Sequence, residues 1–233
     1  MTTPVRTSWL EIAPGYAGHL ALPPGGRGPG LLMWPEIFGV NAHIQAVAAQ
    51  YALDGFVVLA PDVFWRQAPR VELGYVGDDR ARALALMQGY GAADALADIG
   101  VAVAALRALP SVQGGLGSIG YCMGGRLSWL TAATSAVDAS VAYYGGGIQQ
   151  QLECAADITC PMQFHYAGHD DHIPPEAVQR VRDAMACKDA EVHVYPAAAH
   201  GFNCWDRPAW HAGSAALAHG RTLAFLARTL LRV

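Results

Sequence analysis

Hydrophobic and polar positions along the chain form two alternating patterns. Short, almost continuous apolar runs occupy 30–35, 56–61, 115–120, 139–145, 162–168 and 190–196. Runs of this length bounded by Gly, Pro or polar residues are typical of buried parallel strands. Longer segments with helical patterns lie between them, over 41–54, 92–109, 122–135, 175–187 and roughly 208–230. We therefore predict an α/β fold with a mainly parallel central sheet and helices on both faces.

The segments between these elements indicate how the chain is organised. Asn41 is a predicted helix N-cap, while Gly55 and Pro110 mark predicted helix ends. The stretch 62–80 is long and irregular, which favours an ordered functional loop over a domain boundary. The chain shows no internal repeat and no interdomain linker, so we expect one domain over 1–233.

Composition narrows the class of protein. Of the 233 residues, 53% are hydrophobic and 15% are charged, but no apolar stretch reaches the 18 residues typical of a membrane span. The first residues lack the apolar core of a secretory signal, and the five cysteines have irregular spacing, so we expect a cytoplasmic protein without a disulfide framework. A net charge of −4 without a basic run argues against nucleic-acid or membrane partners. We also expect a monomer.

One cysteine lies in an unusual context. Cys122 is the centre of a Gly-x-Cys-x-Gly sequence between an apolar run and a helical pattern. Glycines at this junction predict a sharp strand-to-helix turn, which α/β-hydrolases use to present a nucleophile. A thiol at a helix N-terminus also gains thiolate character. Cys122 is therefore a candidate nucleophile, although a buried cysteine is more often a small hydrophobic residue.

A nucleophilic cysteine needs a base, and the base needs an orienting group. Among nine histidines, His200 is the best candidate, because it follows a predicted strand in a loop of small residues. Asp170 and Asp171 follow an earlier strand, and either carboxylate could accept the Nδ1 proton of His200. The chain order Cys, Asp, His is that of the α/β-hydrolases.

The segment 165–172 also has the composition of a metal site, with three histidines and two aspartates. Its residues alternate along a strand and then turn, so their spacing argues against convergence on one ion. We therefore predict no metal and no cofactor. Glu36 is a further candidate, because it follows an apolar strand and must find a partner there, reach water or raise its pKa.

The sequence resembles the dienelactone hydrolase family, which has the α/β-hydrolase fold and a cysteine nucleophile. The similar segments span nearly the whole chain: PEIFGVNAHI, APDVFWRQAP, GYCMGG, VAYYG, GHDDHIPP and YPAAAHGF. The resemblance implies that Cys122 is the nucleophile and His200 the base, and the family pattern selects Asp171 over Asp170 as the acid. Glu36 would take the thiol proton when substrate binding moves the carboxylate.

The family resemblance also implies where the substrate lies. The oxyanion would bind the backbone N–H groups of Ile37 and Met123. A carboxylate on the lactone would be bound by Arg82, with Arg80 as the alternative, and Tyr144 would complete this part of the site.

Two positions depart from the family pattern. An expected tyrosine is Leu86, and an expected arginine is Cys204, with Arg207 near but out of register. These departures leave the hydrolytic chemistry intact but place the substrate in doubt.

We predict a hydrolase that opens a small carboxylated lactone of the dienelactone type, in the degradation of aromatic compounds, through an acyl-thioester. The alternatives are a general small-molecule carboxylesterase or lactonase, and a thiol redox or ligand-binding protein that does not hydrolyse its ligand. Steady-state turnover distinguishes the last class from the first two.

Overall fold

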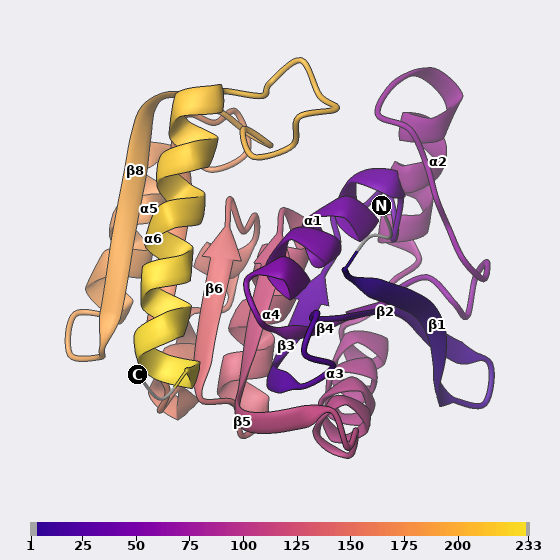
Figure 1. Cartoon of the computed structure of the whole chain (residues 1–233). Helices are drawn as coiled ribbons and strands as arrows, with labels where there is room; N and C mark the ends of the chain where they lie inside the picture. Colours follow the sequence, from indigo (N-terminus) through magenta and orange to yellow (C-terminus); the bar gives the residue numbers. More distant parts are fainter. Residues whose placement is uncertain (1–3, 232–233) are drawn as a thin grey trace.

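The computed structural model describes residues 4–231. Its eight strands form one sheet in the order β1-β2-β4-β3-β5-β6-β7-β8 (Figure 1). The strands are β1 (Arg6–Ala13), β2 (Tyr16–Leu22), β3 (Gly28–Trp34), β4 (Val57–Pro61), β5 (Val112–Tyr121), β6 (Ala139–Tyr143), β7 (Met162–His169) and β8 (Ala190–Ala199). From β4 to β8 all neighbouring strands are parallel. The predicted α/β fold class is confirmed.

The N-terminal hairpin was not predicted. β1 pairs antiparallel with β2, and β2 pairs antiparallel with β4. None of the residues of β1 is fully buried, so its sequence lacks the continuous apolar run that marks the central strands. Backbone pairing at the sheet edge stabilises such a strand without leaving a strong hydrophobic pattern.

Helices cover both faces of the sheet, as predicted. They are α1 (Ala42–Leu53), α2 (Gly77–Gln88), α3 (Ala92–Arg107), α4 (Met123–Thr134), α5 (Pro175–Ala184) and α6 (Ala212–Leu230). In Figure 1, α1 and α6 lie in front of the sheet and α3 and α4 lie behind it. Short 3₁₀ helices, η1 (Ile148–Gln150) and η2 (Leu152–Asp157), follow β6.

The predicted loop 62–80 is irregular only as far as residue 76. Helix α2 begins at Gly77, and Asp78 and Asp79 lie in its first turn, where carboxylates interact favourably with the helix dipole. Ala83 and Leu86 are buried on its inner side. The helical pattern is weak because most of α2 faces water, so only its packing shows where the helix begins.

Parallel strands end at the same edge of a sheet. The segments after β3, β5, β7 and β8 therefore meet, and they contain Glu36, Cys122, Asp170 and His200. The topology alone thus brings residues separated by up to 164 positions to one place.

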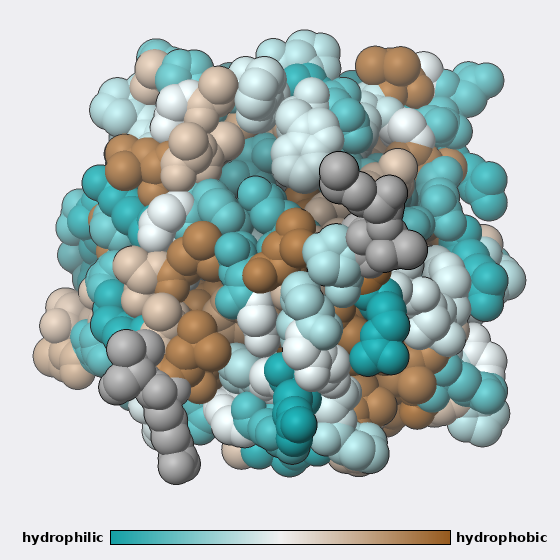
Figure 2. All heavy atoms as spheres, in the orientation of Figure 1, coloured by the Kyte–Doolittle hydropathy of each residue, from teal (hydrophilic) through white to brown (hydrophobic). Residues whose placement is uncertain are grey.

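Within residues 4–231, no single helix is long and apolar enough to cross a membrane. Helices α2 and α3 reach that length and apolar character only when taken together, and they are bent by 90° relative to each other. Figure 2 shows the face over α1 and α6, where hydrophobic residues are interspersed with hydrophilic ones.

Candidate active site

Cys122 is held in a strained conformation between β5 and α4. Its φ of 56° and ψ of −116° lie outside the regions that side-chain-bearing residues favour. A Cβ at Gly120 would overlap the carbonyl of Gly124, and a Cβ at Gly124 would overlap the carbonyl of Trp34. The two glycines therefore permit the close packing that fixes the turn. The Cys122 N–H donates to the carbonyl of Tyr143 at 3.0 Å, which ties the turn to β6.

His200 directly follows β8 and contacts both predicted partner segments. Its Nε2 lies 3.1 Å from Cys122 Sγ, and its Nδ1 lies 2.8 Å from Asp170 Oδ2. Burial lowers the pKa of His200, but hydrogen bonds to Asp170 and Cys122 oppose this effect and raise it to about 10. The arrangement favours an imidazolium next to the sulfur.

The choice of Asp171 as the partner of His200 is wrong. Asp170 makes the contact, and its side chain is 1% exposed, whereas Asp171 is exposed. Asp170 Oδ1 also accepts the N–H groups of His172 and Ile173, at 2.9 and 3.2 Å. This local turn points the first residue after β7 inward and the second outward.

Glu36 is almost completely buried, at 1% exposure, so it does not reach water at the strand end. Its Oε1 accepts a hydrogen bond from Arg207 Nη1 at 2.9 Å, and its Oε2 is buried without a partner among the described residues. Burial raises the pKa of Glu36, while Arg207 and His200 partly counter that rise. The implied contact between Glu36 and the Cys122 thiol is not among the hydrogen bonds of residues 4–231, where the thiol pairs with His200.

Arg207 lies in the site, although the family pattern expects an arginine at residue 204. Successive turns join Gly201 to Cys204 and Cys204 to Arg207 through backbone hydrogen bonds of 2.9 and 3.1 Å. They bury Cys204 completely and return Arg207 to the site. The guanidinium lies 5.7 Å from the ring centres of both Phe38 and Tyr75. An arginine that is out of register with the family pattern therefore lines the cavity and pairs with Glu36.

Cys122 and His200 open into a cavity of about 360 Å³. It is lined by Ile37, Phe38, Arg80, Leu84, Met87, Cys122, Met123, Arg126, Gly146, Gly147, Gln149, Gln150, His172, His200 and Arg207. Ile37 and Met123, the predicted oxyanion residues, are both present. Among the described residues, neither of their backbone N–H groups donates to a protein acceptor.

Two predicted substrate contacts differ from the structure. Arg82 is exposed and is absent from the described cavity lining, whereas Arg80 is part of it. Two positions along a helix turn the side chain by about 200°, which separates these arginines. Tyr144 is fully buried behind the site, with its ring 5.1 Å from that of His200. Leu86 packs in the core beneath α2.

Several lining residues were not predicted. Arg126 lies on α4 four residues after Cys122, and the helical spacing alone could have placed it on the same side. Gln149 and Gln150 come from the 3₁₀ segment after β6, and His172 follows Asp170. His172 packs edge-on against His200, with 5.0 Å between ring centres. Short irregular segments such as these carry no periodic sequence signal.

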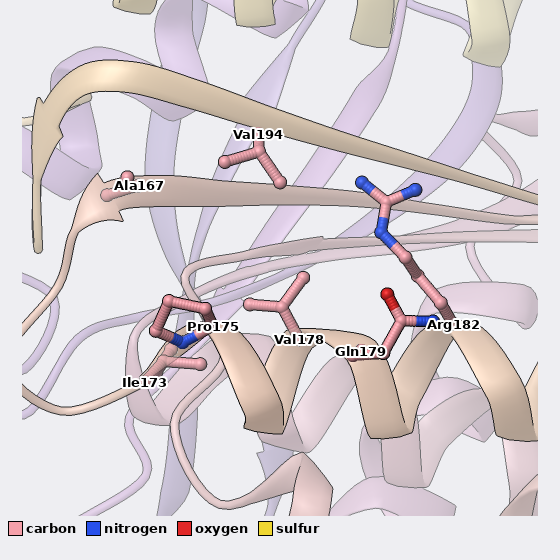
Figure 3. Close-up of a pocket in the computed structure, with 8 residues that line it drawn as sticks. Ala167, Ile173, Pro175, Val178, Gln179, Arg182 and Val194 are labelled. Atoms are coloured by element: carbon pink, nitrogen blue, oxygen red, sulfur yellow. The ribbon is translucent and has the colours of Figure 1, made fainter.

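A second cavity contains none of these reactive groups. It has a volume of about 190 Å³ and lies between β7, β8 and α5, as Figure 3 shows. Ile173, Pro175, Val178 and Val194 give it apolar walls, and Arg182 lies at one end. The cavity beside Cys122 is therefore the better candidate for chemistry.

Within the segment 165–172, His165 and Asp170 have separate partners. In the part of the chain that the structure describes, no three His, Cys, Asp or Glu side chains are grouped as metal ligands. His165 is buried and bonds to Tyr195 Oη and Gln163 Oε1, each at 2.8 Å. Asp170 serves His200 instead.

Proteins of one family match most of this chain. The model of the dienelactone hydrolase family matches residues 16–230. A carboxymethylenebutenolidase of Pseudomonas sp. (strain P51) is 37% identical, covering 91% of this chain and 90% of its own length. The enzyme of the same name from Pseudomonas putida is 32% identical, covering 91% and 93%.

Solved structures show the same fold. A Klebsiella pneumoniae protein named "Putative Dienelactone Hydrolase" has a TM-score of 0.85 at 28% identity, covering 96% of this chain and 99% of its own. Est1E from Butyrivibrio proteoclasticus has a TM-score of 0.70 at 14% identity, covering 96% and 98%, which supports the fold alone. The chain belongs to the dienelactone hydrolase family and is a hydrolase of the α/β-hydrolase fold.

Proposed function

We propose that this protein hydrolyses a small lactone or ester through a catalytic triad of Cys122, His200 and Asp170. The observation that carries the proposal is the continuous contact from Asp170 Oδ2 through the His200 ring to Cys122 Sγ, with distances of 2.8 and 3.1 Å. A nucleophile, a base and an orienting carboxylate in this order are the components of acyl transfer. The contact opens into the cavity of about 360 Å³.

In the first half-reaction, the Cys122 thiolate attacks the lactone or ester carbonyl carbon, and the carbonyl oxygen becomes an oxyanion. The N–H groups of Ile37 and Met123 donate to it. The carbon–oxygen bond then breaks, and the His200 imidazolium gives its Nε2 proton to the leaving enolate or alkoxide. The product is an acyl-thioester on Cys122 with a neutral His200.

In the second half-reaction, neutral His200 removes a proton from water, and the resulting hydroxide attacks the thioester carbonyl. Collapse of the tetrahedral intermediate breaks the carbon–sulfur bond and releases the carboxylic acid. Cys122 returns to the thiolate and His200 to the imidazolium, so the cycle consumes only water. Asp170 holds the ring and its tautomer throughout.

We further propose that Glu36 takes the thiol proton when substrate binding moves its carboxylate. Its buried Oε2 has no partner in the described structure, and burial raises its pKa, which makes the carboxylate a better proton acceptor. In the resting conformer the neutral thiol turns away from His200 toward Glu36. After the proton transfer to Glu36, the thiolate returns to the contact with His200 described above.

The cavity supports a substrate with a carboxylate. Arg80 and Arg207 both line it, although residue 204, where the family pattern expects an arginine, is a cysteine. The relatives named carboxymethylenebutenolidase favour a carboxylated lactone of the dienelactone type. An intermediate of aromatic degradation fits that class.

We further propose that the protein is a cytoplasmic monomer, that residues 1–233 form one domain, and that the reaction needs no cofactor.

Steady-state hydrolysis of cis-dienelactone, trans-dienelactone and a neutral nitrophenyl ester tests the proposal. Multiple turnovers of a dienelactone with higher kcat/KM than the neutral ester are expected. A preference for the neutral ester would instead indicate a general carboxylesterase. A single acylation of Cys122 without turnover would indicate a thiol redox or ligand-binding protein.

A further inference from the structure

We infer that Arg126 is a specificity-determining residue that binds an anionic group of the substrate. The inference rests on the proposed hydrolase function and adds a residue that the family motifs do not include. Arg126 lines the cavity beside Cys122, together with Arg80 and Arg207. No carboxylate is among the described lining residues.

The three arginines differ in whether they form an ion pair. Among the described residues, Arg207 is paired with buried Glu36 at 2.9 Å, and Arg80 and Arg126 form no ion pair. The other arginine ion pairs of the described residues involve Arg66 and Arg228. Arg126 Nε is buried and has no hydrogen-bond partner there. Arg126 has no ion pair among the described residues, so an anion bound in the cavity that it lines would give its guanidinium an acceptor.

The surroundings of Arg126 leave room for the side chain and hold it in place. A Cβ at Gly147 would lie 3.1 Å from Arg126 Cδ and 3.4 Å from its Nη1. The side chain therefore runs against the glycine backbone after β6. Gln149, whose Oε1 accepts the Gly147 N–H at 3.1 Å, closes that loop. Arg126 therefore packs against this loop where both line the cavity.

Helix geometry places Arg126 relative to the chemistry. Cys122 is the N-cap of α4, and Arg126 lies four residues later, on the same side and about 6 Å further along the axis. The N-terminus of α4 adds its own positive partial charge. An anionic group a few bonds from the carbonyl that Cys122 attacks could reach Arg126.

The test compares two lactones that differ only in charge: cis-dienelactone and its primary carboxamide. We expect Arg126→Met to lower the ratio of kcat/KM for the carboxylate over the carboxamide by at least tenfold, the low end for loss of a charge-assisted hydrogen bond. Arg126→Lys should keep part of the ratio, because it retains a positive charge. The control is Arg180→Met, an exposed arginine on α5 that does not line the cavity, which should leave the ratio within about twofold.

A second measurement does not depend on turnover. Glutarate should protect Cys122 of the wild-type protein against iodoacetamide, and Arg126→Met should raise the half-protecting concentration at least tenfold. If the wild type hydrolyses neither lactone, the proposed function fails, and glutarate protection alone decides the role of Arg126. An unchanged ratio or an unchanged half-protecting concentration in a folded Arg126→Met variant would overturn the inference.

Discussion

The turn that holds Cys122 and the outer wall of the cavity are built in opposite ways. The outer wall is formed by α2, through Arg80, Leu84 and Met87. At the turn, Gly120 and Gly124 pack directly against backbone carbonyls, where a side chain would not fit. This close packing holds Cys122 in its strained conformation. On the outer wall, α2 buries only Ala83 and Leu86, and Arg80 is exposed. Cys122 is thus held by backbone packing, whereas the side of α2 that carries Arg80 makes few contacts with the rest of the fold. Such a wall can change without loss of the chemistry.

The largest effect is expected at the nucleophile. Cys122→Ala and His200→Ala should each lower kcat by about 10⁴-fold or more, because members of one catalytic unit are strongly non-additive. Lactone turnover and stoichiometric alkylation measure this directly. Cys187→Ala is the control, since Cys187 is exposed and is not among the described lining residues, and this variant should remain active. Activity after complete modification of Cys122 would rule out the thiol mechanism.

The two neighbouring aspartates offer a matched comparison. Asp170→Asn should lower kcat by about 10³–10⁴-fold, since the amide no longer stabilises the imidazolium or its tautomer. Asp171→Asn should stay within about twofold of wild type, because that side chain is exposed. Steady-state kinetics on one lactone, with thermal unfolding to check folding, provide the measurement. Equal losses in both variants would contradict the assignment of Asp170.

Glu36→Gln tests whether the thiol is stored protonated. It should slow lactone hydrolysis by about 10²-fold, the usual scale for a lost proton acceptor. The rate of Cys122 alkylation between pH 5 and 9 distinguishes the two roles of Glu36. Rapid alkylation of wild type near pH 6, unchanged in Glu36→Gln, would mean that His200 alone generates the thiolate and that Glu36 only anchors Arg207.

Substitutions on α2 should distinguish Arg80, which lines the cavity, from Arg82, which is not among the described lining residues. Arg80→Met should cost the carboxylated lactone about 1.5–3 kcal/mol of transition-state binding, the range for a charge-assisted hydrogen bond, and should cost a neutral ester less. Arg82→Met should cost less than about 0.5 kcal/mol on either substrate, as for other exposed positions. The measurement is kcat/KM on both substrates. A larger loss in Arg82→Met would show that α2 moves when substrate binds.

The smallest effect concerns stability and pH. The pKa of His200 is raised to about 10 from an ordinary value of 6.5, so the folded state binds this proton more tightly than the unfolded state. The resulting stabilisation is complete below about pH 6.5 and is lost as the pH rises through 10. The Tm difference between wild type and His200→Gln should therefore be largest near pH 6 and should shrink as the pH rises to 10.5. A constant difference would show that the imidazolium does not stabilise the fold.

The local sequence determined the elements whose signal is local. Six apolar runs predicted the six parallel strands. The reason is clearest for β3, β4 and β6, which are buried almost throughout, because a strand buried on both faces must be apolar along its length. The Gly-x-Cys-x-Gly turn predicted where Cys122 lies, because glycine is required wherever backbones pack this closely. His200 was found because it follows the last strand, where parallel sheets gather their sites.

Tertiary structure decided the features that depend on side-chain direction. Asp170 rather than Asp171 meets His200 because the turn after β7 points the first carboxylate inward. Arg80 rather than Arg82 lines the cavity because the packing of Ala83 and Leu86 sets the rotation of α2. Arg207 reaches Glu36 because two successive turns shorten the path from His200. A shift of one or two residues leaves a sequence pattern almost unchanged, but it reverses where a side chain points, and only packing determines that direction.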